Sequence, residues 1–178
     1  MPTQILSFWF GELGPHQWFS KAPVLDAHMR ERFLELHTCC MAGKLAAWRQ
    51  TPQGALAEVI LLDQFSRNMF RDTPAAFASD PLALALAQQA LERGFQHQLS
   101  PVEHGFLLMP FMHSESRLIH RQALTLFEQL GDPSRLYYEQ LHKAIIDRFG
   151  RYPHRNAVLG RISTAEELEF LQQPGSSF

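Results

Sequence analysis

One long apolar stretch constrains the fold of this chain more than any other feature. It follows Thr51-Pro52, a capping residue with proline at the first helical position. It then runs to Phe65 with apolar residues on nearly every side of a helix, a pattern typical of a helix that is buried all round. No segment alternates apolar and polar residues as a half-buried strand does. We therefore expect an all-α protein built around this central helix.

Proline, glycine and capping residues divide the rest of the chain into further helices. We expect a short helix capped by Thr3, then helices over residues 23–41, 80–91 and 101–110. The next helix is capped by Ser114 and has these inward residues: Leu118, Ile119, Ala123, Leu126, Phe127 and Leu130. A helix capped by Ser134 follows, with an inner stripe of Tyr137, Leu141, Ala144, Ile145 and Arg148, and a capping box at residues 163–166 opens the last helix. Short turns between successive helices favour antiparallel neighbours. The expected architecture is a superhelical bundle of antiparallel helix pairs in a single helical domain, residues 1–178, although no clean repeat of tetratricopeptide length is visible.

Composition narrows the class of function. The net charge is −2, so no global basic field favours nucleic acid, and no apolar window approaches the length of a membrane span. The two cysteines, Cys39 and Cys40, are adjacent and form no disulfide framework. We expect reduced thiols and, with no signal peptide visible at the start, a cytoplasmic protein that binds neither nucleic acid nor membrane.

Arginine carries most of the unusual chemistry, because it outnumbers lysine thirteen to three. Residues 148–161 hold four arginines and His154 without an acidic residue, and an Arg-Asn pair occurs both there and in residues 61–71. The arginines either converge on an anion or tie the helices together through Asp63, Glu115 and Asp147. Three carboxylates cannot neutralise six arginines, which favours a ligand. The candidate ligand-binding residues are Asp63, Arg67, Asn68, Arg151, Arg155 and Asn156.

Histidines supply the candidate catalytic groups. His113 is followed by Ser114 and Glu115, which fits a base oriented by a carboxylate or a nucleophilic Ser114, but a Ser114 helix cap beside a packed imidazole is favoured because it already explains the serine. His154 lies among arginines, which favour its neutral form, but it is equally a loop residue bonded to a carbonyl. The candidates are His113, Glu115 and His154. Metal-ligand spacing is absent, since His97, His104, His113 and Glu115 are dispersed, so we expect neither a metal nor a cofactor.

Several motifs together resemble one family. They are Leu61 to Asn68, Pro110 to Glu115 and Arg148 to Asn156, supported by Phe8-Trp9-Phe10-Gly11, Trp48, Leu159-Gly160-Arg161 and Glu166-Glu167. The chain resembles, over essentially its whole length, the uncharacterised bacterial proteins grouped as domain of unknown function nine-two-four. The resemblance implies an all-helical fold similar to tetratricopeptide-repeat proteins and no established activity. Ser66 departs from the family pattern, which favours proline there.

Three functional hypotheses remain. The first is a polar pocket, lined by the candidates above, that binds an anionic small molecule or peptide group. The second is an enzyme, a hydrolase or transferase on a phosphorylated or carboxylate substrate, with His113 or His154 as base. The third is a scaffold that grips a partner peptide on a helical surface, in which case the arginine motifs are structural.

Overall fold

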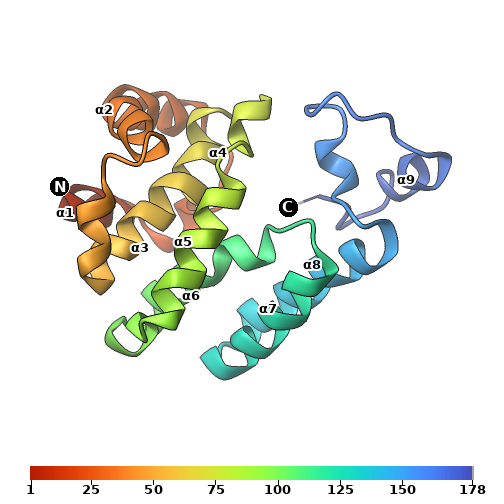
Figure 1. Ribbon diagram of the computed structural model, residues 1–178. Helices are drawn as coiled ribbons and strands as arrows, with labels where there is room; N and C mark the ends of the chain where they lie inside the picture. The colour runs from red at the N-terminus through yellow and green to blue at the C-terminus, as the bar shows by residue number, and fades with distance from the viewer. Residues whose placement is uncertain (178) are drawn as a thin grey trace. The chain divides into compact units, whose positions relative to one another are not determined.

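The computed structural model describes residues 1–177, which contain helices and turns and no strand (Figure 1). The α-helices are α1 Pro2–Ser7, α2 Pro23–Met41, α3 Pro52–Ile60, α4 Ser66–Met69, α5 Asp80–Glu92, α6 Pro101–Met112, α7 Arg117–Leu130, α8 Pro133–Phe149 and α9 Ala165–Phe170. The chain forms two compact units, unit 1 (residues 1–71 and 75–110) and unit 2 (residues 72–74 and 111 onward). The all-α prediction is confirmed, and the expectation of one domain stays a prediction.

Unit 1 is organised around α3, which packs against α1 and α5. Thr51 caps it by accepting a hydrogen bond from the Gly54 backbone N–H at 3.1 Å. Every residue from Gly54 to Ile60 is buried, so the predicted central buried helix is confirmed. Among these residues is Glu58, whose carboxylate accepts two hydrogen bonds from Arg49, at 2.8 and 3.1 Å. That bidentate pair satisfies the buried charge.

Two π-helical turns, which sequence periodicity did not predict, interrupt the helices of unit 1. One spans Phe8–Glu12 after α1, and the other spans Leu61–Phe65 between α3 and α4. The backbone stays helical across both ends of the second turn, so residues 52–69 form one continuous helix with a wide turn inside it. Such turns insert one residue relative to the α-helix and often occur at functional sites.

Short 3₁₀ turns connect several of these helices. They occur at Pro15–Gln17, Ala46–Gln50, Pro74–Ala76, Phe95–Gln98 and Pro153–Arg155.

The helix starts show which of the predicted capping residues are correct. The Ser100–Glu103 capping box is confirmed, because Glu103 accepts from the Ser100 N–H at 2.9 Å. Helix α1 begins at Pro2, so Thr3 is not its cap. Helix α6 continues past Pro110, since a proline in the last turn forfeits one hydrogen bond without an incompatible φ.

Three caps in unit 2 lie at neighbours of the predicted residues. Ser116, not Ser114, accepts from the Ile119 N–H to begin α7. Asp132, not Ser134, begins α8 and accepts from two backbone N–H groups. The last capping box pairs Thr164 with Glu167, one residue later than expected. Each predicted residue is itself a good cap, so local preference alone could not choose between them.

Helices α7 and α8 form a pair joined through Gly131 and Asp132, and Gly150 ends α8 with a φ of 71°. Their inner stripes match the prediction in part. Ala123, Phe127 and Ile145 are buried as expected, whereas Leu118, Tyr137, Ala144 and Arg148 are exposed. The other buried residues are His120 on α7 and Glu139, His142 and Ile146 on α8. Hydrophobic periodicity missed the three polar ones, which share the inner face of unit 2.

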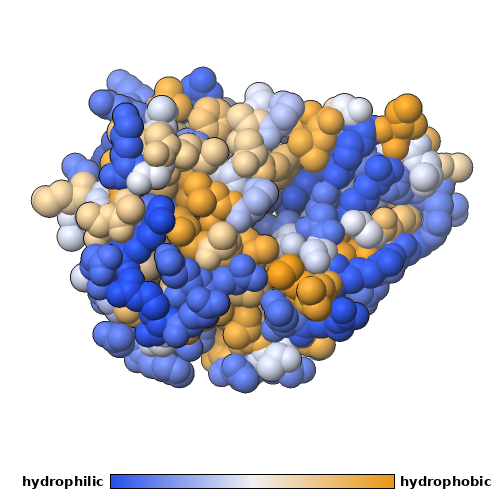
Figure 2. Space-filling model, viewed as in Figure 1, coloured by the Kyte–Doolittle hydropathy of each residue, from blue (hydrophilic) through white to orange (hydrophobic). Residues whose placement is uncertain are grey.

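Polar side chains cover much of the face shown in Figure 2, and hydrophobic atoms appear there in smaller patches. Cys39 and Cys40 are both free thiols, as predicted. Burial raises the pKa of the Cys40 thiol to about 12, with the Glu58 carboxylate adding to the effect. Among the described helices, none is both long enough and apolar enough to span a membrane.

Candidate functional site

The first Arg-Asn motif is held by carboxylates of unit 1. Arg67 donates to both oxygens of Asp80, at 2.8 and 2.9 Å, and lies 3.2 Å from Asp63. Asn68 donates to Asp26, which also accepts two hydrogen bonds from Arg71. The expected Asp63–Arg67 pair is therefore confirmed, and the other partners come from distant helices. These contacts tie α4 to α2 and to the start of α5.

Beside this motif lies a buried hydroxyl chain that the sequence did not suggest. His37 Nε2 is 2.7 Å from Ser66 Oγ, which is 2.8 Å from Ser79 Oγ, and Ser79 donates to the Leu62 carbonyl. A carbonyl only accepts, so the three bonds require each group to donate towards it, with His37 Nε2 protonated. His37 thus donates to Ser66 and cannot act as its base. Ser66, the departure from the family pattern, makes two bonds that proline could not.

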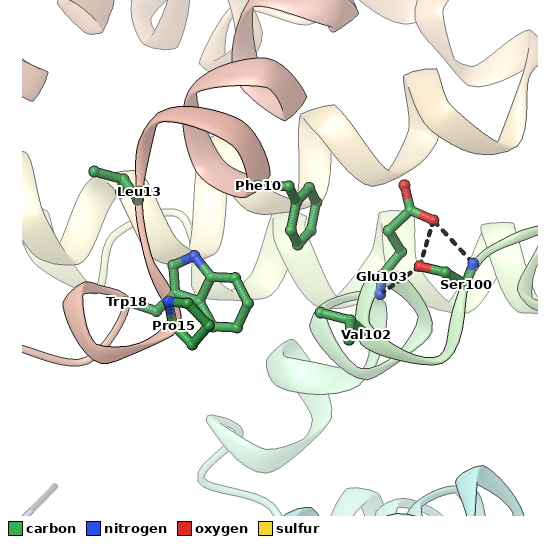
Figure 3. A pocket seen from close by; sticks show the side chains of 7 residues that line it. All are labelled: Phe10, Leu13, Pro15, Trp18, Ser100, Val102 and Glu103. Atoms are coloured by element: carbon green, nitrogen blue, oxygen red, sulfur yellow. Dashed lines mark hydrogen bonds between the residues drawn. The ribbon is translucent and has the colours of Figure 1, made fainter.

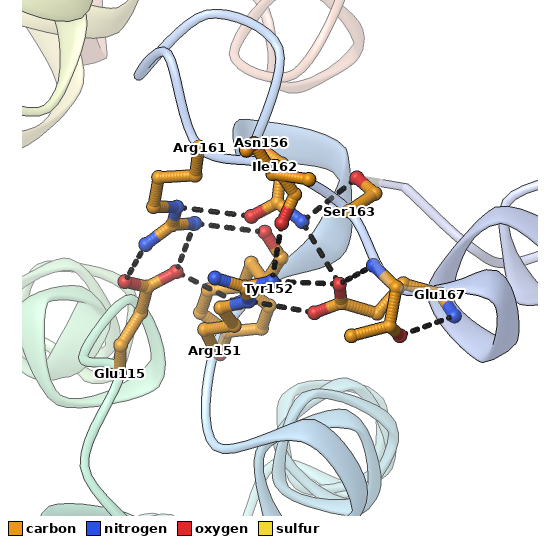
Figure 4. A network of polar contacts seen from close by, with 9 residues as sticks. Glu115, Arg151, Tyr152, Asn156, Arg161, Ile162, Ser163 and Glu167 are labelled. Carbon is orange, nitrogen blue, oxygen red and sulfur yellow. Dashed lines mark hydrogen bonds and ion pairs between the residues drawn. The ribbon is translucent and has the colours of Figure 1, made fainter.

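The second Arg-Asn motif forms a closed polar network in unit 2 (Figure 4). Arg161 donates to both oxygens of Glu115, at 2.6 and 2.9 Å, and to Asn156 at 2.9 Å. Arg151 donates to both oxygens of Glu167, at 2.6 and 2.7 Å, and Asn156 also reaches Glu167 at 3.3 Å. Asn156 therefore joins two bidentate ion pairs, which fix the loop between α8 and α9.

The carboxylates of this network are strongly stabilised in their ionised form. The hydrogen bond from Arg151 is the main reason that the pKa of Glu167 falls to about 2. Burial alone would raise the pKa of Glu115, but hydrogen bonds from Arg161 and the Tyr152 N–H outweigh burial and lower it. Glu115 is thus bound on both oxygens, which leaves little freedom to orient a catalytic histidine.

The prediction of too few carboxylates for the arginines is wrong, because Asp63, Glu115 and Asp147 are not the only carboxylates near them. Asp26, Asp80, Glu166 and Glu167 also serve as partners, and the Asp147 side chain pairs with Lys143 instead. Arg67, Arg71, Arg148, Arg151 and Arg161 all lie in ion pairs with carboxylates. These five arginines act as ties within their units.

Arg155 belongs to a different arrangement, which we call the Tyr152 cluster. The Tyr152 side chain is fully buried, and the Arg155 guanidinium carbon lies 4.5 Å from its ring centroid. The ring centroids of His154, His142 and His120 lie 5.6, 5.7 and 6.3 Å from that of Tyr152. His113 completes the cluster, 6.4 Å from His142, and its carbonyl accepts from Arg155 at 3.1 Å. His113 and His154 are half-buried, so the cluster reaches the surface through them.

Positive potential at this cluster acts on His142. Its Nδ1 lies 2.8 Å from the Tyr138 carbonyl and must donate to it, so Nε2 carries the lone pair in the neutral ring. Burial, and then the charges of His113, His120 and Arg155, lower the pKa of His142 to about 3. His142 is therefore neutral at pH 7 and too weakly basic to serve as a good general base.

A buried acid–base pair borders the cluster. His120 Nδ1 lies 2.7 Å from Glu139 Oε1, and both side chains are inaccessible to solvent. His120 Nε2 lies 2.8 Å from the Ser114 carbonyl, so that nitrogen must be protonated. The short contact to Glu139 then needs one further proton, held by either partner. Burial raises the pKa of Glu139, which helps the pair retain that proton.

The structure brings some predicted residues together and adds others. In unit 2, His113, His154 and Arg155 meet at the Tyr152 cluster, while Glu115, Arg151 and Asn156 form the neighbouring network. Sequence reasoning missed His120, Glu139, His142 and Tyr152. A signal existed for His120, because it precedes Ala123 and Phe127 by three and seven residues and so shares their inward stripe.

The dispersed histidines form no metal centre in the part of the chain that is described. His97 and His104 lie in unit 1, and His113 and Glu115 lie in unit 2. Across residues 1–177, no group of three or more histidine, cysteine or acidic side chains is arranged to hold a metal ion. The question of cofactors stays open, and the polar candidates remain the two arginine networks and the Tyr152 cluster.

Comparisons with known proteins place the chain in a family without assigning a function. A search of curated proteins gives no match. A solved protein of unknown function from Agrobacterium tumefaciens is 36% identical, with a TM-score of 0.91 over 96% of each chain. The model of a bacterial family of unknown function, DUF924, matches residues 5–175. The chain therefore belongs to the DUF924 family of bacterial proteins, as its motifs suggested.

Proposed function

We propose that this protein binds the anionic group of a small molecule or peptide, a carboxylate or a phosphate, at the Tyr152 cluster. The main support is the packing of the Arg155 guanidinium and the rings of His154, His142 and His120 around the buried Tyr152 ring, at 4.5, 5.6, 5.7 and 6.3 Å, with His113 beside His142. Arg155, His113 and His154 would supply the N–H donors, and donors with little water around them stabilise an anion strongly. Burial is the main reason that the pKa of His142 is low, and the charges of His113, His120 and Arg155 lower it further.

The proposal separates ligand contact from support. Arg155, His113 and His154 would contact the anion, and His142 would lie beside it as a neutral imidazole. Arg151 and Asn156 would support the loop, since a ligand at Arg151 would have to displace Glu167. Direct contact of a ligand with Asp63, Arg67 or Asn68 stays a prediction of the sequence, and there too a ligand would compete with bound carboxylates.

Two broader features belong to the same proposal. The tetratricopeptide-like superhelical arrangement is supported by the α7–α8 pair and its short connection. A cytoplasmic location is supported by the free thiols of Cys39 and Cys40. Catalysis by His113 or His154 stays the alternative at this cluster, and turnover would distinguish it from binding.

The test is a thermal-stability panel of phosphates, nucleotides, phospho-sugars and carboxylates at fixed ionic strength. A ligand at a hundredfold excess over its Kd stabilises the native state by about 2.7 kcal/mol. We expect one class to raise the midpoint of the wild type and not of Arg155→Gln, which removes the guanidinium. Arg151→Gln is the control, and it should lower the midpoint yet keep the ligand-induced rise.

Two further measurements protect this test against a misfolded variant. His113→Asn changes a half-buried group and should also abolish the rise. By NMR titration, the bound anion should raise the pKa of His142, because it offsets the neighbouring positive charges. A blank panel, or equal loss of the rise in Arg151→Gln and Arg155→Gln, would contradict binding at the cluster. A compound that binds is then incubated with the protein to look for product.

A further inference from the structure

A shallow groove in unit 1 has a volume of about 350 Å³, and no residue of the arginine networks lines it. Its walls come from two segments (Figure 3). The turn after α1 supplies Phe10, Leu13, Pro15 and Trp18, and the start of α6 supplies Ser100, Val102 and Glu103. The walls are mainly apolar, and Glu103 is the one residue with a formal charge among these seven. A groove of this size fits a small ligand group.

Two aromatic walls of the groove meet at nearly a right angle. The Phe10 and Trp18 rings are tilted by 81°, with their centroids 6.0 Å apart. Trp18 is fixed from behind, because its indole Nε1 donates to the Trp9 carbonyl at 2.7 Å and its ring packs 4.9 Å from that of Phe106. The two rings meet edge to face and are held in place, and an aromatic face attracts an alkylated ammonium group.

The carboxylate at the edge of the groove has one oxygen committed to the fold. Glu103 Oε2 accepts from the Ser100 backbone N–H at 2.9 Å and from the Ser100 hydroxyl at 2.7 Å, which begins α6. Among residues 1–177, no side chain or backbone group donates a hydrogen bond to Glu103 Oε1. The capping bonds therefore hold a carboxylate in a fixed place while its second oxygen stays accessible to a cation.

From these walls and this charge we propose that the groove binds a small organic cation, an alkylated ammonium group. The alkyl groups would lie against Phe10 and Trp18, and the positive charge would face Glu103. Charge complementarity selects this occupant, since an anion would meet the carboxylate and a neutral group would gain nothing from it. The site is independent of the Tyr152 cluster, because it lies in the other unit and selects the opposite charge.

Tetramethylammonium chloride is the probe, titrated against sodium chloride at constant ionic strength. The signal is the indole N–H of Trp18 in a proton–nitrogen correlation spectrum, assigned by its loss in Trp18→Phe. We expect this signal to shift saturably with tetramethylammonium and not with tert-butanol, which has a similar size and no charge. Glu103→Gln keeps a carbonyl for the capping bond and should weaken binding at least about fivefold.

Matched variants complete the experiment. Phe10→Leu keeps an apolar side chain without the π-face and should also weaken binding, whereas Glu35→Gln, an exposed position on α2, should leave it unchanged. Equal shifts with tert-butanol would mean an apolar groove without charge selection and would overturn the proposal. So would a linear response to tetramethylammonium, full binding by Glu103→Gln, or binding of an uncharged proline-rich peptide without any response to the cation.

Discussion

The Glu167 carboxylate shows how a single residue makes the second arginine motif sensitive to acid. Its pKa is lowered from 4.5 to about 2, first by the hydrogen bond from Arg151. In the unfolded chain this carboxyl group has its ordinary pKa of 4.5. The ion pair therefore contributes its full stability above about pH 4.5 and loses it progressively as the pH falls towards 2.

We predict that Glu167→Gln is less stable than the wild type at pH 7 and that this gap narrows as the pH approaches 2. Urea-unfolding midpoints at several pH values measure the gap. Glu166→Gln is the control, because Glu166 pairs with Arg148 while both side chains are largely solvent-exposed, so its effect should stay within about 1 kcal/mol. A gap for Glu167→Gln that did not change with pH would contradict this account.

Two substitutions of Glu139, the partner of His120, should differ in their effect on the free energy of unfolding. In Glu139→Gln the new amide can donate to His120 Nδ1 while Nε2 still donates to the Ser114 carbonyl, so we expect the free energy of unfolding to change by less than about 1 kcal/mol. Glu139→Leu leaves Nδ1 buried without a partner and should cost about 1–3 kcal/mol. Chemical denaturation measures both. Equal effects of the two substitutions would contradict a stabilising hydrogen bond at His120 Nδ1.

Residue-level prediction from sequence succeeded where partners are local. Asp63 and Arg67 are four residues apart on a helix, so their ion pair could be predicted. The Arg67–Asp80 and Arg161–Glu115 pairs span 13 and 46 residues, and nothing in a sequence without topology selects them. The Tyr152 cluster was missed in part for the same reason, because Tyr152, His120 and His142 come from three separate segments.

At the scale of elements, proline and glycine punctuation predicted α2 closely, from Pro23 to Met41. Prediction failed where two good caps were neighbours, as with Asp132 and Ser134, because tertiary packing chooses between them. It failed again on the inner stripe of α8, where Glu139 and His142 take positions that apolar residues usually occupy. The helices were predictable, and so was their phase where apolar residues mark the inner face, as Met29 and Phe33 do on α2.

Close approach between α3 and the turn Ala46–Gln50 gives an element-scale prediction. A Cβ on Gly54 would clash with the Trp48 carbonyl oxygen, a backbone atom that cannot move aside cheaply. We predict that Gly54→Ala lowers the free energy of unfolding by about 1–3 kcal/mol or more. Gly11→Ala is the control, because nothing lies within 4 Å of its added carbon, and it should be neutral or slightly stabilising. Thermal melts of both variants decide this, and equal midpoints would contradict the close approach.

At the scale of the whole molecule, the aromatic residues provide separate reporters for the two units. Trp9, Trp18 and Trp48 all lie in unit 1, and Tyr137, Tyr138 and Tyr152 all lie in unit 2. A single cooperative domain, as the sequence predicts, requires both reporters to change together. Tryptophan fluorescence and tyrosine second-derivative absorbance can be followed in one urea titration.

Ile146 is fully buried in unit 2. We predict that Ile146→Val lowers the free energy of unfolding by about 0.5–1.5 kcal/mol. The urea midpoints of the tryptophan and tyrosine signals should fall equally. Ile60→Val is the matched change in unit 1 and should act in the same way on both signals. Separate transitions, with each variant moving only the reporter of its own unit, would show that the units unfold independently.

The wide turn at Leu61–Phe65 sets the angular position of everything that follows it on its helix. The wider winding of this turn takes up one extra residue, so α4 keeps the angular position that it would have in a regular helix one residue shorter. If the same residues wound as an α-helix, at about 100° per residue, α4 would be rotated by roughly that angle about its axis. Asn68 would swing away from Asp26, and Arg67 from Asp80, in one step. The winding of this turn is therefore as much a part of the specification of unit 1 as any side chain in its core.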